Sequence, residues 1–160
     1  MKNKLSKLLS LVLAAMLSCG LLMGCSGIDR TALTSEEFKT IIEEHGYEVV
    51  DVIDQFADYD HIDAAYVATH SVLSYQIEFY QISDDKTAER MFESNVEMME
   101  KEKDSYTSKT SFSLGNYEKY TFTTNEMYES VVRIGDTLIY CNVAEEYGPY
   151  AKEMIELLGY

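Results

Sequence analysis

The chain has 160 residues, of which 46% are hydrophobic and 26% are charged, and its net charge at pH 7 is −15. This apolar content, together with 13 tyrosines, excludes a disordered tail, since disordered segments carry too little apolar surface to fold. The acidic balance disfavours nucleic acid as a partner and repels anionic lipid surfaces, so cations or basic partners are more compatible with this protein.

The first 24 residues are typical of an export signal. Lys2, Lys4 and Lys7 form a short cationic start, and an apolar stretch follows from Leu8 to Met23, interrupted only by Ser, Cys and Gly. An uncleaved membrane anchor is the alternative interpretation. The stretch is shorter than the about 20 apolar residues that are needed to span a bilayer, so we favour a signal peptide over residues 1–24.

The signal ends in residues 22–25, Leu-Met-Gly-Cys. This tetrapeptide resembles the lipobox of bacterial lipoprotein precursors. The resemblance implies cleavage between Gly24 and Cys25, a diacylglyceryl group on the Cys25 sulfur, and acylation of the new amino terminus, for example by palmitate. It also implies that Cys25 anchors the protein to the extracytoplasmic face of the cell membrane. Cys19, after Ser18, is a second candidate, but it has a poorer upstream residue and leaves a shorter apolar region.

Removal of the signal leaves 136 residues, with 10 basic side chains against 28 acidic ones and a net charge of −18. This length favours one domain. We interpret residues 25–33 as the lipidated cysteine and a short linker, and residues 34–160 as a single domain. Residues 26–33 would reach roughly 26 Å when extended, so we expect the domain to lie close to the membrane.

A capping-box pattern begins the first predicted helix. Thr34 is followed by Glu37 three residues later, apolar residues at helical spacing come next, and Gly46 ends the pattern. Residues 47–53 are apolar and β-branched and predict a strand, and an acidic loop follows over residues 54–63.

Two further strands are predicted over residues 64–69 and 73–82. The second alternates apolar and polar residues, which indicates one buried face that includes Phe79. A helix then runs to about residue 103. Because the connection between them is short, we expect Phe79 to pack against Phe92 of that helix. The inner face of the helix is predicted to hold Ala88, Met91, Phe92, Val96 and Met99.

From residue 108 onward, the sequence predicts a meander of three or four strands followed by a last helix. The strands are separated by short turns at residues 115–116, 125–126 and 135–136. Pro149 fits the first turn of the helix, which carries Met154, Ile155, Leu157 and Leu158. The order α-β-β-β-α-β-β-β-β-α with such tight connections predicts an α+β fold, with helices packed against a mostly antiparallel sheet.

No catalytic or nucleotide-binding fingerprint is present in the sequence, although triads assembled from distant residues leave no local pattern. The acidic loop offers Asp54, Asp58, Asp60 and Asp63 with His61 to a hard cation, but it lacks the glycine of an EF-hand loop, and a solvated loop is the favoured interpretation. The spacing of His45, His61 and His70 matches no local zinc motif.

Cysteine and tyrosine give two further expectations. Cys141 has no partner in the mature chain if Cys25 is lipidated, and we expect it to be a small core residue. Exposed tyrosines on a sheet face can stack on sugars or bind a protein partner, and the favoured alternative is that tyrosine is simply a good strand former with one polar end. The predicted strands contain Tyr66, Tyr75, Tyr80, Tyr117, Tyr120, Tyr128 and Tyr140.

The mature part resembles small uncharacterised lipoproteins of low-GC Gram-positive bacteria. The resemblance rests on Gly-Asn-Tyr at 115–117, Thr-Leu-Ile-Tyr at 137–140 and Leu-Gly-Tyr at 158–160. It implies no activity and no site residue. We therefore expect a monomeric, lipid-anchored, non-enzymatic domain that needs no cofactor and binds a protein or cell-envelope ligand. The alternative is an envelope hydrolase or metal-dependent enzyme whose site is assembled from His and Asp residues.

Overall fold

The computed structural model describes residues 29–73, 75–101 and 108–160. Its helices are α2 (Ser35–Glu44), α3 (Asp85–Lys101) and α4 (Gly148–Leu157), with short 3-10 turns η1 (Ile53–Phe56) and η2 (Glu145–Tyr147). Its strands are β1 (Tyr47–Asp51), β2 (Ile62–His70), β3 (Gln76–Ile82), β4 (Ser108–Leu114), β5 (Tyr117–Thr123), β6 (Met127–Ile134) and β7 (Thr137–Ala144). The predicted α+β class and the order of the elements are confirmed.

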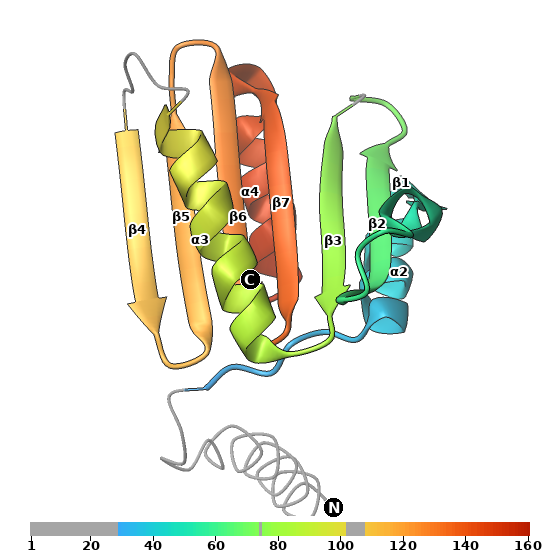
Figure 1. The fold of residues 1–160 in the computed structure, drawn as a ribbon. Coiled ribbons are helices and arrows are strands. Elements are labelled where there is room, and N and C mark those ends of the chain that lie inside the picture. The colour runs from blue at the N-terminus through green and yellow to red at the C-terminus, as the bar shows by residue number, and fades with distance from the viewer. Residues whose placement is uncertain (1–28, 74, 102–107) are drawn as a thin grey trace, which may run out of the picture.

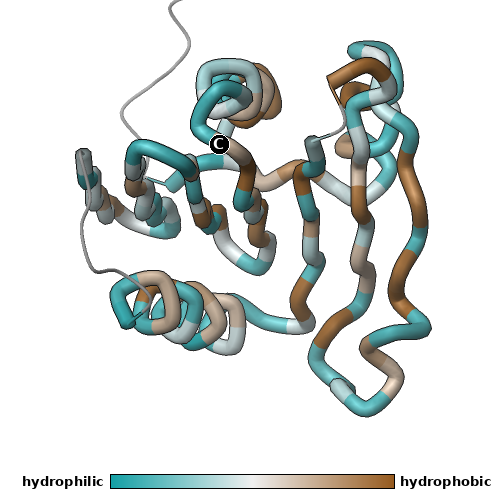
Figure 2. The backbone as a smooth tube through the Cα atoms, turned by 90° about the horizontal axis from the view of Figure 1, so that it is seen from above, coloured by the Kyte–Doolittle hydropathy of each residue, from teal (hydrophilic) through white to brown (hydrophobic). Residues whose placement is uncertain are grey.

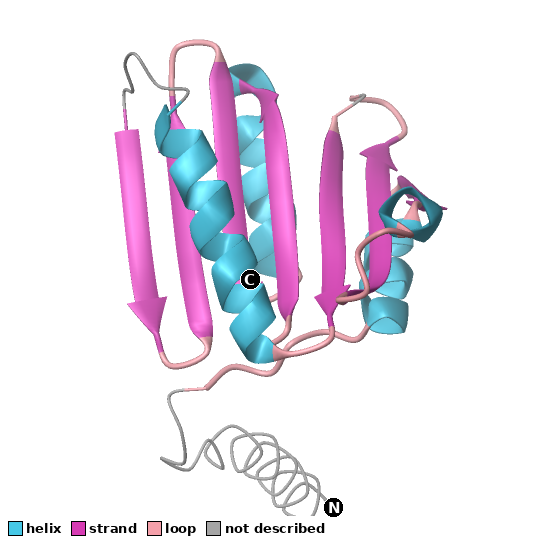
Figure 3. Ribbon diagram, viewed as in Figure 1, coloured by secondary structure: helices cyan, strands magenta, loops and turns pink. Residues whose placement is uncertain are grey.

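All seven strands belong to one antiparallel sheet in the order β1-β2-β3-β7-β6-β5-β4 (Figures 1 and 3). The two halves of the sheet meet where β3 pairs with β7, with Tyr80 opposite Leu138. Gly115 and Gly135 take positive φ angles of 61° and 56°, which the tight hairpin turns after β4 and β6 require. The predicted turn chemistry is therefore confirmed in the meander.

The helices divide between the two faces of the sheet, as the view along the strands shows (Figure 2). Helices α2 and α4 cover one face, here called the α2/α4 face, where Phe38, Ile42 and Ile155 are fully buried. Helix α3 alone covers the other face, here called the α3 face, where it contacts β3, β6 and β7. The inner residues predicted for this helix are confirmed, because Ala88, Phe92 and Met99 are buried and Met91 and Val96 are partly buried.

The expectation that Phe79 packs against Phe92 is wrong. Phe79 lies on the α2/α4 face, where its ring stacks on Phe38 at a centroid distance of 4.6 Å. Phe92 packs on the opposite face with Ile82 and Leu138. The short connection after β3 keeps α3 beside the sheet but does not decide which face the helix covers. The face of β3 that α3 covers also carries apolar residues, because Ile82 is buried and Tyr80 is partly buried there, so the strand is not apolar on one side only.

Several local predictions are confirmed, whereas the start of one strand and the burial of one helix residue differ from the prediction. Thr34 caps α2 and forms the full capping box with Glu37. Strand β3 begins at Gln76 rather than at residue 73, which lengthens the connection after His70. In the last helix, Leu157 is exposed, whereas the other three apolar residues named from the sequence are buried.

Residues 29–33, which the sequence placed in a linker, are held against the domain. The Asn116 carboxamide accepts a hydrogen bond from the Arg30 N–H and donates one to the Arg30 carbonyl oxygen, at 2.7 and 2.8 Å. The Leu33 N–H donates to the Tyr160 hydroxyl, and the Leu33 side chain packs against the core of the α2/α4 face. The folded unit therefore includes Asp29.

Among the described helices, none is long and apolar enough to cross a membrane.

Candidate functional site

A hollow of the α3 face forms a groove between α3 and η1, floored by β3, β6 and β7, and we call it the sheet groove. It is about 700 Å³ in volume. Its lining residues are Phe56, Glu78, Tyr80, Met91, Asn95, Met98, Val131, Leu138 and Tyr140.

A carboxylate lies in this otherwise mostly apolar hollow. The Tyr80 hydroxyl donates to Glu78 Oε2 at 2.5 Å, and the Gln76 amide donates to Glu78 Oε1 at 3.2 Å. Neither hydrogen bond neutralises the charge of Glu78. No lysine or arginine among the described residues forms an ion pair with it. The groove therefore offers a negative charge that is already held in position by hydrogen bonds.

A second tyrosine and carboxylate pair lies beside the first. The Tyr140 hydroxyl donates to Glu129 Oε1 at 2.6 Å. Burial, and then the hydrogen-bonded carboxylates, raise the pKa of both Tyr80 and Tyr140 far above the ordinary value. Both hydroxyls therefore stay protonated and act as donors, so these tyrosines orient carboxylates and do not act as bases.

The apolar walls of the sheet groove come from separate elements. The Phe56 ring from η1 meets the Tyr80 ring edge to face at a centroid distance of 5.6 Å. Met91 and Met98 come from α3, and Met98 is 52% exposed. Methionine side chains are flexible and adapt to ligands of different shape, which is why they are common on surfaces that bind peptides.

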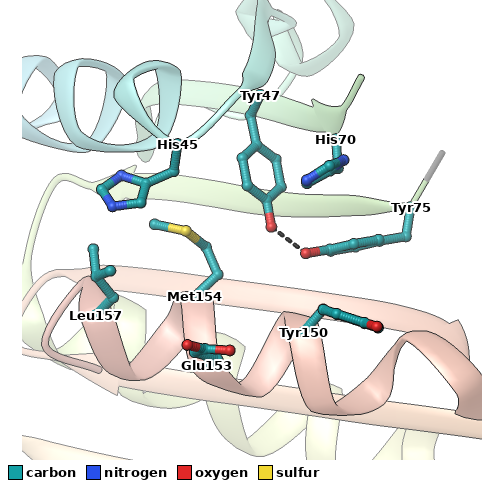
Figure 4. A pocket seen from close by; sticks show the side chains of 8 residues that line it. All are labelled: His45, Tyr47, His70, Tyr75, Tyr150, Glu153, Met154 and Leu157. Atoms are coloured by element: carbon teal, nitrogen blue, oxygen red, sulfur yellow. Dashed lines mark hydrogen bonds between the residues drawn. The ribbon is translucent and has the colours of Figure 1, made fainter. Parts of the chain in front are cut away.

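A second hollow lies on the α2/α4 face, between the end of α2 and helix α4, and we call it the histidine pocket (Figure 4). It is about 430 Å³ in volume. Its lining residues are His45, Tyr47, His70, Tyr75, Tyr150, Glu153, Met154 and Leu157.

The hydrogen bonds of the two histidines differ. His45 Nδ1 lies 2.7 Å from the Ile41 carbonyl oxygen and must donate to it, which leaves Nε2 of the neutral ring as an acceptor. His70 Nδ1 accepts from the N–H groups of Val72 and Leu73, both at 3.2 Å, so its proton is on Nε2. The pocket therefore combines one imidazole acceptor with one imidazole donor.

The tyrosines of the histidine pocket are tied to each other. The hydroxyls of Tyr47 and Tyr75 form a hydrogen bond (Figure 4), and burial raises the pKa of both. The His70 ring stacks on Tyr75 at a centroid distance of 5.5 Å. The described residues that line this pocket include no Ser, Thr or Cys, so they offer acid and base groups without an alcohol or thiol nucleophile.

The structure separates most residues that the sequence offered for chemistry. His45 and His70 share one pocket, whereas His61 lies on the other face, in a hollow with Thr87, Arg90, Met91 and Ser94. Within residues 29–73, 75–101 and 108–160, no three His, Cys, Asp or Glu side chains come together as a metal site. Asp54, Asp58, Asp60 and Asp63 are all exposed.

Cys141 and the strand tyrosines are mostly core. Cys141 is a free thiol that is 1% exposed, and burial raises its pKa to about 12, as expected for an inert core residue. None of the seven tyrosines named from the sequence is exposed. Tyr80 and Tyr140 are partly buried in the sheet groove, and the buried ones are Tyr66, Tyr75, Tyr117, Tyr120 and Tyr128.

Sequence reasoning named the two groove tyrosines but missed Glu78 and Phe56. The alternation of β3 does place Glu78 and Tyr80 on the same face, two residues apart. Phe56 had no such signal, because only the tertiary fold brings η1 over β3. Cys25, the predicted lipidation site, lies outside the described residues.

Comparison with known proteins adds no relative: no protein-family model, curated protein or solved structure matches the chain.

Proposed function

We propose that this protein is a lipid-anchored, extracytoplasmic binding domain, not an enzyme, and that its sheet groove holds a basic, partly apolar segment of a protein partner. The lipobox-like residues 22–25 support the anchor. Cys25 is the proposed site of attachment.

The observation that carries the binding proposal is the place of Glu78 among apolar side chains. A ligand that combines a cationic group with apolar side chains would pair with Glu78 and would cover Phe56 and Met98 at the same time. The net charge of −18 for residues 25–160 would attract such a ligand from a distance. An acidic segment would be repelled for the same reasons.

The histidine pocket supports the alternative, an envelope enzyme, less well. Tyrosines and Glu153, but no aspartate, serine, threonine or cysteine, are among the described residues that line it with the two imidazoles. Among the described residues, no group of three His, Cys, Asp or Glu side chains supports the metal-dependent form of this alternative.

The test uses the anchored full-length protein in zwitterionic vesicles. The probe is a short fluorescent peptide with blocked ends that alternates Lys and Phe, and protein-free vesicles provide the background. We expect Glu78→Gln to weaken binding about ten-fold, which corresponds to about 1.4 kcal/mol. Raised salt should weaken binding further.

Two controls make this test specific. Glu43→Gln removes the same charge from an exposed site on α2, on the other face of the sheet, and should leave binding nearly unchanged. A peptide that alternates Glu and Phe should not bind. If Glu43→Gln weakens binding as much as Glu78→Gln, the attraction comes from the overall charge and the proposed groove is wrong.

A further inference from the structure

The short connection between Cys25 and the folded domain fixes which end of the sheet can face the membrane. Asp29 is already part of the folded unit, because its carboxylate accepts from the Asn116 N–H at 3.2 Å. Only residues 26–28 separate it from Cys25. Four peptide units span at most about 15 Å between Cα atoms, and this limit holds for any conformation of those residues.

Arg30 fixes the chain to the same corner of the domain. Its guanidinium lies over the Tyr117 ring, 3.6 Å from the centroid, and Nη1 donates to the Gly159 carbonyl oxygen at 3.3 Å. With the two hydrogen bonds between Arg30 and Asn116, this holds the chain at the β4–β5 turn and the end of α4. We call Asp29, Arg30, Asn116 and Gly159 the anchor corner.

The anchor corner belongs to one end of the sheet. The Gly135 N–H in the β6–β7 turn donates to the Asn116 carbonyl oxygen in the β4–β5 turn, and the Ile82 N–H at the end of β3 donates to the Asp136 carbonyl oxygen. The opposite end contains the β5–β6 turn, where the Glu145 N–H donates to the Glu126 carbonyl oxygen. In Figure 1, the segment that leads into α2 runs along the end that contains the β4–β5 and β6–β7 turns.

One hollow at the anchor corner has two basic side chains, Arg30 and Lys119, against a single carboxylate, Glu156. Burial lowers the pKa of Lys119, and no described carboxylate forms an ion pair with it. In a domain with a net charge of −18, this corner is therefore compatible with the phosphates of lipid headgroups.

We propose that the anchor corner faces the phospholipid headgroups and that the strands lead away from the membrane, with the β5–β6 turn at the far end. This inference rests on the proposed lipidation of Cys25. The seven residues of β5 span about 23 Å, so the two ends of the strand differ in distance from the bilayer by up to that amount. The sheet groove then opens sideways, at a height that a partner in the same membrane can reach.

The experiment measures how near each end lies to the bilayer. A fluorophore is attached to Ser113→Cys, near the anchor corner, or to Asn125→Cys, in the β5–β6 turn; both positions are exposed. The lipidated full-length protein is placed in vesicles that contain a headgroup quencher, and intact-mass analysis confirms the acyl groups. Buried Cys141 should not react with the label, and the unsubstituted protein checks this.

We expect the label at residue 113 to be quenched several-fold more than the label at residue 125. A flexible Gly-Ser insert of about 20 residues between Ile28 and Asp29, with a mean span of roughly 25 Å, should remove this difference while the anchor corner stays intact. Equal quenching with the natural connection, or a difference that survives the insert, would overturn the orientation. A protein without acyl groups on Cys25 would instead overturn the anchor itself, and the mass measurement separates the two failures.

Discussion

The two faces of the sheet are covered by different numbers of helices. Seven strands spaced about 4.8 Å apart make a sheet roughly 29 Å wide, and one helix with its side chains covers about 10 Å of it. The α2/α4 face has two helices, and its hydroxyl groups pair with one another, as Thr137 does with Tyr160. The α3 face has one helix among the described residues, and strands β3 and β7 carry tyrosines on this face that are hydrogen-bonded to carboxylates.

This difference in helix coverage indicates which face can bind a ligand. A face covered by two helices has little strand surface left, so a change there alters the stability of the fold. A face with one helix keeps a partly open area of mixed polarity, so a change there alters binding with less effect on the fold.

The largest effect should come from the aromatic pair of the α2/α4 face. Phe79 and Phe38 are both fully buried, so Phe79→Ala should lower the free energy of unfolding by about 3–5 kcal/mol in denaturant titrations. A double-mutant cycle between Phe38 and Phe79 should give an interaction energy of about 0.5–1.5 kcal/mol. The cycle between Phe79 and Phe92 should be additive, since the sheet separates them; an interaction there would mean that the helices are placed on the wrong faces.

The α3 face also contains a nearly buried ion pair, which should come next. Arg133 Nε donates to Glu118 Oε2 at 2.6 Å, and the two side chains are only 7% and 15% exposed. Glu118→Ala leaves the guanidinium without its carboxylate and should cost about 3 kcal/mol of stability. Glu97→Ala removes an exposed partner of Lys101 and should change stability by at most about 0.5 kcal/mol. Equal losses of stability in Glu118→Ala and Glu97→Ala would show that the burial of Arg133 does not add to the cost of removing its carboxylate partner.

Alkaline pH should destabilise the fold, because buried tyrosines on both faces have raised pKa values, and two of them on the α2/α4 face titrate before Tyr80 and Tyr140. Burial raises the pKa of Tyr128 and Tyr160 to about 12, above the unfolded value near 10. The folded state therefore holds these protons more tightly, and the stability that this contributes is complete below pH 10 and is lost as pH rises towards 12. Each tyrosine should cost about 1 kcal/mol by pH 11. Thermal unfolding between pH 8 and 11.5 measures this, and a midpoint that stays constant above pH 10 would contradict the burial of these hydroxyls.

The smallest effect concerns the start of α2. Thr34→Ala removes the hydrogen bond from the Glu37 N–H to the Thr34 hydroxyl, so it should cost about 1 kcal/mol. Thr40→Ala, at an exposed position within the same helix, should be neutral or slightly stabilising because alanine is the better helix former. If Thr34→Ala and Thr40→Ala lose the same stability, the loss in Thr34→Ala does not come from the capping box.

The sequence predicted the features that depend on neighbours in the chain. The capping box at Thr34, the turns at Gly115 and Gly135 and the inner face of α3 are all local patterns, and the structure has them. The faces were harder to predict, because both sides of β3 carry apolar residues. Ile77 and Phe79 lie on one side, and Tyr80 and Ile82 lie on the other. Local alternation therefore could not say which side α3 covers.

The groove and the anchor corner depend on residues that are far apart in the chain. Phe56 meets Tyr80 only because β1 and β2 bring η1 over the sheet. Arg30 meets Asn116 across 86 positions. No spacing in the sequence records such contacts, since they arise from the order of the strands. The composition of the sequence did indicate many tyrosines and an acidic charge, and the groove contains two of those tyrosines and one carboxylate, Glu78.

Photo-crosslinking from the sheet groove in the native envelope tests most directly whether this groove binds a protein partner. A photoreactive residue replaces Met98, which is 52% exposed at the groove, or Val72, which is 79% exposed in the β2–β3 connection. We predict that position 98 captures a basic segment of a protein partner, that Glu78→Gln strongly reduces this capture, and that position 72 does not capture the same segment. Equal capture at both positions, or capture at position 98 that Glu78→Gln leaves unchanged, would contradict the claim that the open part of the α3 face is the binding site.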